Sequence, residues 1–211
     1  NWPDREALTR VIREAEAAGA KAIVPLVNTP LPVSHTPSSV GFRLPVGASL
    51  AHGAGDQGDL DAKNDFGYIR WMAGITNLPI VPKGIMHPDD ARAVLDAGAK
   101  AVIVSNHGNR QVARSLATID ALGAVVAAVG DRAEVYHDGG VRSGTDALIA
   151  LAMGARAVFV ARTVCWGLAV GGAEGVAKAI GALTDELASD AGMCGAADVT
   201  RLPADLIVTA P

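Results

Sequence analysis

Short apolar runs alternate along the chain with longer stretches in which apolar and small residues recur at helical spacing. Residues 4–18 show this helical spacing and end at Gly19, and residues 22–27 form an apolar run typical of a buried strand. The alternation then repeats. It predicts strands over residues 80–83, 101–105, 134–138 and 157–161, and helices over residues 88–97, 117–129, 145–153 and beyond residue 161.

The regular succession of strand and helix indicates an α/β fold, either a doubly wound sheet or a (β/α)8 barrel. Helices end at glycine in the repeated phrases at residues 18–22, 97–101 and 153–157, which is typical of one junction type used several times. About five strands are visible, whereas a barrel has eight strands in roughly 250 residues. As a barrel, the chain would therefore be incomplete.

Two features interrupt the pattern. Residues 31–66 lack clear periodicity, and an active-site lid and a loosely ordered surface loop are equally good interpretations of this long segment. Pro25 and Pro82 fall within predicted strands, where we expect a bulge because proline cannot donate to the ladder. No second domain is indicated.

Composition narrows the class of protein and its partners. The chain has 211 residues, of which 50% are hydrophobic and 19% charged, enough to bury a substantial core. The net charge of −4, without a basic run, argues against nucleic acid as a partner. No apolar run approaches the ~20 residues of a membrane span, and no leader is visible, so we expect a cytoplasmic protein with no membrane partner.

Cys165 and Cys194 lack the spacing of a disulfide framework or a zinc site. We expect no metal, and we expect both cysteines to be small buried residues. The chain begins at Asn1 rather than Met and directly in a helical pattern, which favours either processing or a start within a longer protein.

Polar residues gather where the predicted strands end. In parallel βα architectures the carboxyl ends of the strands build the active site, because the loops converge there. We therefore expect one cavity lined by four strand ends, namely Lys83, the segment from Ser105 to Arg110, the segment from Asp138 to Arg142, and the pair Ala161 and Arg162.

The last two of these segments suit a phosphate group. Glycines after a strand let backbone N–H groups approach an anion, and arginines add charge-assisted hydrogen bonds. The simpler alternative is that Asp-Gly-Gly forms an ordinary turn. The residues concerned are Asp138, Gly139, Gly140, Val141, Arg142, Ala161 and Arg162.

His107 and Arg110 suit a hydroxy acid substrate. An imidazole can take a proton at neutral pH, and a nearby guanidinium can bind a carboxylate. The alternative is an ordinary surface histidine. Lys83 is costly to bury without an anionic partner, which a reduced flavin would supply, although the side chain could equally extend to solvent.

Three ordered motifs resemble the FMN-dependent α-hydroxy acid oxidase and dehydrogenase family, which includes glycolate, lactate and mandelate oxidising enzymes on a (β/α)8 barrel. The resemblance covers nearly the whole chain apart from the lid-like stretch, and it implies about the last five βα units of that barrel. The motifs are Leu78-Pro79-Ile80-Val81-Pro82-Lys83-Gly84, Ser105-Asn106-His107-Gly108-Asn109-Arg110-Gln111 and Asp138-Gly139-Gly140-Val141-Arg142-Ser143-Gly144-Thr145-Asp146.

The resemblance implies FMN as cofactor and a role for each matching residue. His107 resembles the catalytic base, Arg110 the carboxylate clamp, and Lys83 the residue beside flavin N1 and O2. Ser105 would contact the flavin. The segments from Asp138 to Arg142 and Ala161-Arg162 resemble the ribityl and phosphate site, although the family usually has glycine at position 161.

The chain also departs from the family. The amino-terminal strands and two active-site tyrosines are missing, so we expect another segment or chain to complete the barrel, and we expect a homo-oligomer. Asn28 stands where the family has an aspartate paired with the catalytic histidine, and His35 falls about where a second substrate arginine would lie. Leu26 replaces a polar flavin neighbour, and Val-Ala-Arg follows Gln111 instead of Leu-Asp-Gly.

The sequence thus predicts FMN-dependent oxidation of a small (S)-2-hydroxy acid to the 2-oxo acid. Two alternatives remain open: an FMN-binding barrel of the same ancestry with a different redox reaction, and a catalytically silent FMN-binding protein. Asn28, Leu26 and His35 keep them open, because they alter the substrate side.

Overall fold

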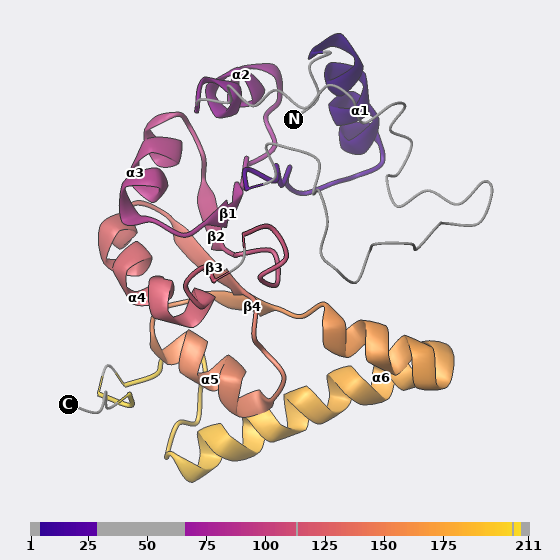
Figure 1. Ribbon diagram of the computed structural model, residues 1–211, viewed down its shortest axis with the longest axis vertical. Coiled ribbons are helices and arrows are strands. Elements are labelled where there is room, and N and C mark those ends of the chain that lie inside the picture. Colours follow the sequence, from indigo (N-terminus) through magenta and orange to yellow (C-terminus); the bar gives the residue numbers. More distant parts are fainter. Residues whose placement is uncertain (1–4, 29–65, 113, 204, 208–211) are drawn as a thin grey trace.

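Four parallel strands form the sheet in the computed structural model, which describes residues 5–28, 66–112, 114–203 and 205–207 (Figure 1). The strands lie in the order of the chain, and each pairs in parallel with the next. They are β1 (Lys83–Ile85), β2 (Ala101–Val104), β3 (Glu134–Asp138) and β4 (Ala157–Phe159).

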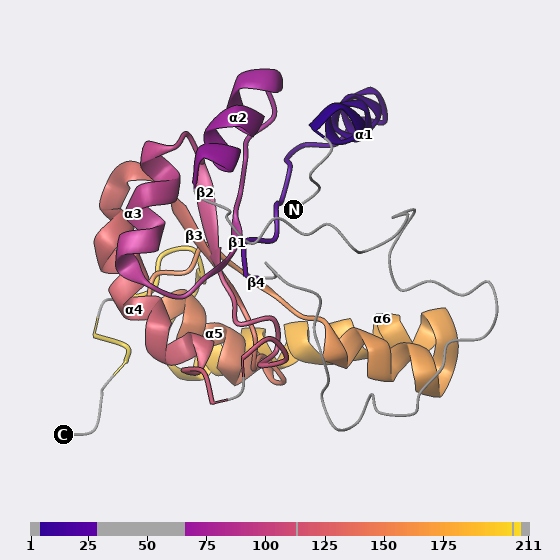
Figure 2. The same ribbon diagram turned by 45° about the horizontal axis from the view of Figure 1, so that its top comes forward.

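Helices connect these strands and cover one face of the sheet (Figures 1 and 2). Buried apolar residues on that face, among them Val102, Val104 and Val135, pack with residues from the helices into the main core. The opposite face carries a smaller cluster of Val81, Ala101 and Ile103. The connecting helices are α3 (Pro88–Asp96), α4 (Thr118–Val129) and α5 (Gly144–Ala152), and η3 (Gly130–Arg132) is a short 3-10 turn.

A fifth segment pairs with the sheet beyond β1. Residues 23–27 form isolated parallel bridges, Ile23 with Ile80 and Leu26 with Lys83, rather than the regular strand predicted over 22–27. Pro25 and Pro82 contribute only their carbonyls, which accept from the N–H groups of Lys83 and Ile103. The register shifts between Lys83 and Ile85, so the irregularity expected near Pro82 is present.

Most of the predicted elements are present with ends shifted by one or two residues, and β3 agrees at both ends. Helix α1 (Arg5–Ala17) lies within the helix expected over 4–18. Helix α2 (Gly67–Ile75) was not predicted, and the segment 31–65 and His35 lie outside the described residues. The expectation of buried cysteines was wrong, because both Cys165 and Cys194 are exposed.

The last helix, α6 (Arg162–Met193), is a helical hairpin, because Gly171 and Gly172 leave helical geometry and the chain turns back (Figure 1). Its returning half packs against α5. A Cβ atom on Gly144 would lie 2.1 Å from the Leu187 nitrogen, so only glycine permits this approach. The Glu186 carboxylate accepts from the Gly144 N–H at 2.7 Å. None of the helices in the described part of the chain is long and apolar enough to cross a membrane.

Candidate active site

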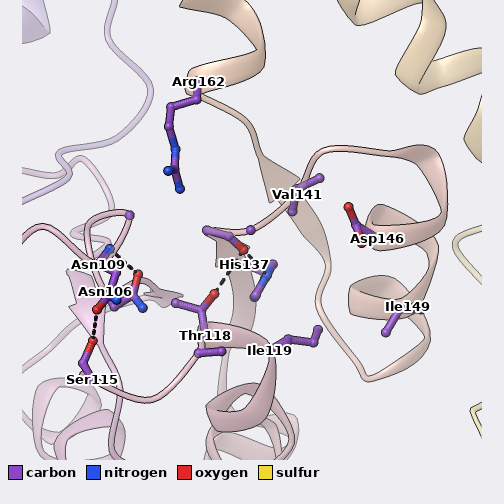
Figure 3. Close-up of a pocket in the computed structure, with 14 residues that line it drawn as sticks. Asn106, Asn109, Ser115, Thr118, Ile119, His137, Val141, Asp146, Ile149 and Arg162 are labelled. Carbon is purple, nitrogen blue, oxygen red and sulfur yellow. Dashed lines mark hydrogen bonds between the residues drawn. The ribbon is translucent and has the colours of Figure 1, made fainter. Parts of the chain in front are cut away.

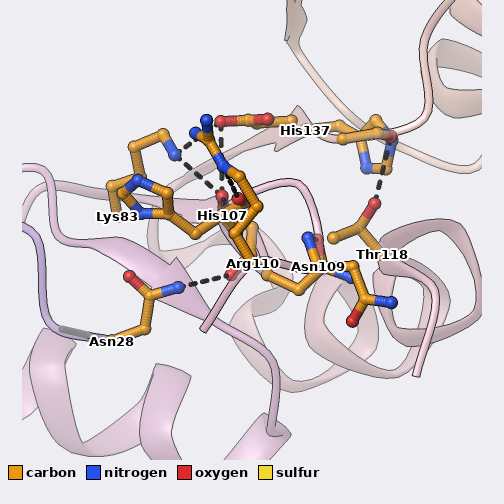
Figure 4. A network of polar contacts seen from close by, with 11 residues as sticks. Asn28, Lys83, His107, Asn109, Arg110, Thr118 and His137 are labelled. Carbon is orange, nitrogen blue, oxygen red and sulfur yellow. Dashed lines mark hydrogen bonds and ion pairs between the residues drawn. The ribbon is translucent and has the colours of Figure 1, made fainter. Parts of the chain in front are cut away.

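A polar network joins Lys83 at the start of β1 to residues at the carboxyl ends of β2 and β3 (Figure 4). Lys83 Nζ lies 2.5 Å from Asp138 Oδ2 and donates to Ser105 Oγ at 2.8 Å. The Ser105 hydroxyl donates to Asp138 at 3.2 Å and accepts from the His107 N–H at 3.2 Å. Ser105 is fully buried, and the Lys83 and Asp138 side chains are only 20% and 17% exposed. Partial burial strengthens this ion pair relative to a surface pair, so it fixes β1 against β3.

The loop after β2 presents His107 to this network. His107 and Asn109 have φ angles of 57° and 61°, in the left-handed region that non-glycine residues seldom adopt. The loop is held by hydrogen bonds from Asn109 N to Asn106 and from Arg110 Nε to the His107 carbonyl at 3.1 Å. Arg110 itself is exposed, so its guanidinium remains accessible to a substrate.

The environment of His107 favours its neutral form. Burial lowers the pKa of His107 from its usual 6.5, and the positive charges of Lys83 and Arg110 lower the pKa further, while Asp138 acts in the opposite sense. Its Nδ1 atom is buried and has no hydrogen-bond partner among the described residues. A neutral imidazole with an unpaired nitrogen can accept a proton at neutral pH.

Asn28 reaches the same region from residues 23–28. Its Nδ2 lies 3.5 Å from the Ser105 carbonyl, while its Oδ1 is buried and without a partner in the described structure. A Cβ on Gly84 would lie 2.5 Å from Asn28 Cγ, so the amide packs directly on the Gly84 backbone. Asn28 therefore places a neutral amide beside the network (Figure 4).

Two adjoining cavities extend from the network toward the loops after β3 and β4. One of about 290 Å³ is lined by Lys83, His107, Arg110 and the two predicted anion segments. The other, of about 370 Å³, is shown in Figure 3 and shares Gly108, Gly139, Gly140, Val141 and Arg162 with the first. The structure thus brings together the predicted residues Lys83, Ser105, His107, Arg110, Asp138, Gly139, Gly140, Val141, Arg142, Ala161 and Arg162.

The phosphate-type segments present free donors. Gly139 and Gly140 have φ angles of 108° and 79°, which favour glycine. Arg142 and Arg162 are exposed, and neither forms an ion pair within the described structure. Two unpaired guanidinium groups beside a glycine loop are suited to hold an anion.

Sequence reasoning missed two residues that line the larger cavity, Thr118 and His137. Both are buried, and both contact the Gly139 carbonyl (Figure 3). Side-chain alternation along β3 would have placed His137 opposite to Asp138. The alternation could not have shown that Thr118 of α4 contacts the same Gly139 carbonyl as His137. The described residues hold no group of three or more His, Cys, Asp or Glu side chains suited to a metal ion.

Known proteins resemble the chain along most of its length. The sequence profile of the FMN-dependent dehydrogenase family matches residues 1–209. An L-lactate oxidase of Nostoc sp. is 40% identical over 203 residues, which cover 87% of this chain and 56% of that protein. The 2-hydroxyacid oxidase 1 of Homo sapiens is 37% identical over 227 residues, covering 98% of this chain and 61% of the human protein.

The fold is similar to that of mandelate oxidase. A crystal structure of mandelate oxidase with 3,3-difluoro-2-hydroxy-3-phenylpropionic acid matches with a TM-score of 0.85 and 38% identity, over 93% of this chain and 58% of that chain. The predicted fold class is confirmed, since the sheet and its helices form part of a (β/α)8 barrel. The chain spans less than two thirds of the length of each of these relatives.

Proposed function

The chain belongs to the FMN-dependent dehydrogenase family, and we propose that it carries the base and cofactor side of an enzyme that oxidises a small (S)-2-hydroxy acid. Relatives named lactate oxidase and 2-hydroxyacid oxidase support this substrate class. The observation that carries the proposal is the convergence of His107, Arg110 and Lys83 on one cavity that ends at two unpaired arginines.

The residues present fit FMN. Gly139, Gly140, Arg142 and Arg162 offer backbone and guanidinium donors for its phosphate, and Lys83 with Ser105 lies where the strand ends converge. Both glycines have positive φ angles, which favour glycine, and a Cβ on Gly139 would lie 2.9 Å from Thr118 Oγ1. When bound, FMN supplies a two-electron acceptor. Ala161 lines the cavity, and because alanine keeps its backbone N–H, the absence of the family's usual glycine does not remove a donor.

The substrate loses two electrons and two protons when it becomes a 2-oxo acid; the two electrons and one proton would go to bound FMN, and the other proton goes to His107. Arg110 binds the carboxylate through a bidentate pair and so orients the hydroxyl-bearing carbon toward His107. His107 takes one of the protons, because its lowered pKa keeps it neutral before reaction. The Lys83 charge, shared with Asp138, offsets negative charge that builds up in the cavity.

Anaerobic spectroscopy tests the activity. The full-length protein is purified with its flavin, and glycolate, lactate and mandelate are added without oxygen. Bleaching of the oxidised flavin spectrum by any of the three is the expected result. A protein that purifies with FMN but keeps an oxidised spectrum with all three would contradict the proposed oxidation.

A second candidate is an FMN-binding barrel with a different reaction or none. Asn28 favours it, because two of the three buried side-chain atoms without partners in the described residues, Asn28 Oδ1 and His107 Nδ1, lie on the substrate side of the site. Bound FMN without reduction by 2-hydroxy acids would favour this candidate. Absence of FMN would contradict both.

We also propose that the chain forms the carboxy-terminal part of one FMN-binding barrel, with residues 31–66 as a lid. The outer edge of β4 has no partner strand among the described residues, and Phe159 and Trp166 beside it are 46% and 50% exposed. A further segment or chain that completes the barrel would cover them, and we propose a cytoplasmic homo-oligomer. If residues 1–211 alone stay monomeric and unfold cooperatively, the completing segment is not needed.

A further inference from the structure

The Gly139 carbonyl is held by two buried side chains from different elements. We infer that His137, together with Thr118, is a positioning residue that aims the Gly140 N–H at the phosphate of the cofactor. This inference rests on the proposed FMN site, and it assigns a function to a histidine outside the three motifs of the sequence.

The contacts are direct. Thr118 Oγ1 donates to the Gly139 carbonyl at 3.1 Å, and His137 Nε2 lies 3.1 Å from the same oxygen (Figure 3). The two side chains are 3% and 1% exposed. A carbonyl oxygen only accepts, so the neutral imidazole must carry its proton on Nε2. Its Nδ1 atom then carries a lone pair. This atom is buried and has no hydrogen-bond partner among the described residues.

Peptide geometry passes this constraint to the next residue. The described structure holds no cis peptide bond, so the Gly139 carbonyl and the Gly140 N–H point in opposite directions. Fixing the carbonyl toward Thr118 of α4 therefore turns the Gly140 N–H away from α4, and Gly140 lines both cavities together with Arg162. The Gly140 N–H has no hydrogen-bond acceptor in the described part of the chain.

The loop needs such a constraint because it contains two consecutive glycines. Glycine has the largest backbone freedom of any residue, so an unrestrained pair would sample many orientations of the central peptide. A Cβ on Gly139 would lie 2.9 Å from Thr118 Oγ1, so the close approach to Thr118 itself requires glycine. The two glycines alone would leave the backbone of this loop flexible, and the contacts with Thr118 and His137 restrain it.

The choice of histidine at this position is not explained by packing. Val135, two residues earlier on the same face of β3, is a buried apolar residue, and an apolar side chain would fill position 137 without burying polar atoms. Burial lowers the pKa of His137, although the Gly139 carbonyl and Asp138 oppose this shift. A buried nitrogen without a partner is a cost that the hydrogen bond to Gly139 offsets only in part.

Binding of two flavins separates a positioning role from a structural one. FMN and riboflavin share the ring and the ribityl chain, and only FMN carries the phosphate. Apoprotein of the full-length chain is titrated with each flavin by fluorescence quenching for wild type, His137→Leu, His137→Gln and Thr118→Val. Gln retains a donor near the position of Nε2, and Val keeps the shape of threonine without its hydroxyl.

We expect His137→Leu to raise the Kd for FMN about 5- to 10-fold, the effect of one lost hydrogen bond, and to leave the Kd for riboflavin within a factor of two. His137→Gln should restore most of the FMN affinity, and Thr118→Val should repeat the FMN-specific loss even if His137→Leu does not fold. Equal weakening of both flavins, or no weakening of FMN, would overturn the inference. Failure of wild type to bind FMN would instead overturn the proposed function.

Discussion

The two sides of the candidate site differ in how completely their polar groups are paired. On the side of Asp138 and Gly139, carboxylate and carbonyl are each held by two neighbours. On the side of His107 and Asn28, each side chain keeps a buried atom without a partner; on the cofactor side the one such atom among the described residues is Nδ1 of His137, which holds the Gly139 carbonyl through its other nitrogen. The carboxylate and the carbonyl of the cofactor side are therefore fixed before a ligand arrives, whereas the substrate side is incomplete in the described part of the chain.

The largest expected effect is on the substrate side, at His107. His107→Ala removes the base and should lower the rate of flavin reduction by a 2-hydroxy acid about 100- to 10,000-fold, because no other described imidazole reaches the substrate cavity. The affinity for FMN should stay within a factor of two. Stopped-flow absorbance measures the rate, and the exposed His87, which caps α3, provides the control as His87→Ala. Unchanged reduction would remove the assigned role.

Arg162 tests the cofactor side with a smaller effect. Arg162→Ala should raise the Kd for FMN about 10- to 100-fold, the usual effect of losing a hydrogen bond to a charged group. Fluorescence titration measures it. Arg92→Ala is the matched control, because Arg92 is an exposed arginine paired with Asp89 on α3, away from both cavities. Comparable losses in the two variants would mean that general charge, rather than the site, attracts FMN.

Asn28 tests whether the unpaired substrate side can be completed. The reaction requires neutral His107, so the acid limb of kcat/KM follows the pKa of His107, which lies below 6.5 in this structure. In Asn28→Asp a carboxylate favours the protonated imidazole, so the limb should move to higher pH by about one unit or more. Asn28→Leu, which adds no charge, should not move it upward. The pH dependence of kcat/KM, measured from initial rates, tests this prediction. If the acid limb of Asn28→Asp stays where it is in the wild type, position 28 does not affect the pKa of His107.

The smallest effect concerns the support beneath the cofactor loop. Asp146 accepts from the N–H groups of Arg142 and Ser143 and completes the capping box of α5. Asp146→Ala should lower the free energy of unfolding by about 1 kcal/mol, measured by urea denaturation. The exposed Asp131 gives the control as Asp131→Ala. A loss no larger than that of the control would mean that the cap does not stabilise this loop.

The sequence predicted the parts of the fold that depend on local pattern. The glycines that end the helices and the apolar runs of the strands predicted β2, β3 and the helices after them. Each of these signals lies within a few residues of sequence. Helix α2 was missed because it adjoins a long aperiodic segment and has glycines at its first and penultimate positions, Gly67 and Gly74. Residues 22–27 were expected as a strand but form only isolated bridges, at Ile23 and Leu26, with Pro25 unable to donate.

The candidate site divides in the same way. Lys83, Ser105 and Asp138 were placed together from their positions at strand ends, which parallel topology brings to one edge. The pairing of Thr118 with His137 depends on how α4 packs on β3, which no local pattern encodes. The burial of Asn28 Oδ1 against Gly84 likewise arises only in three dimensions.

The contact between Gly144 and the returning half of α6 has a consequence for local unfolding. Gly144 follows the cofactor loop directly, its N–H bonds to Glu186, and Thr145 donates to Asp190. Opening of α6 would therefore release the start of α5 and the loop before it as one cooperative unit. The amide protons of residues 142–146 should exchange with solvent at the same rate as those of the returning half of α6, which contains Glu186 and Asp190, rather than at the rate of an ordinary surface turn.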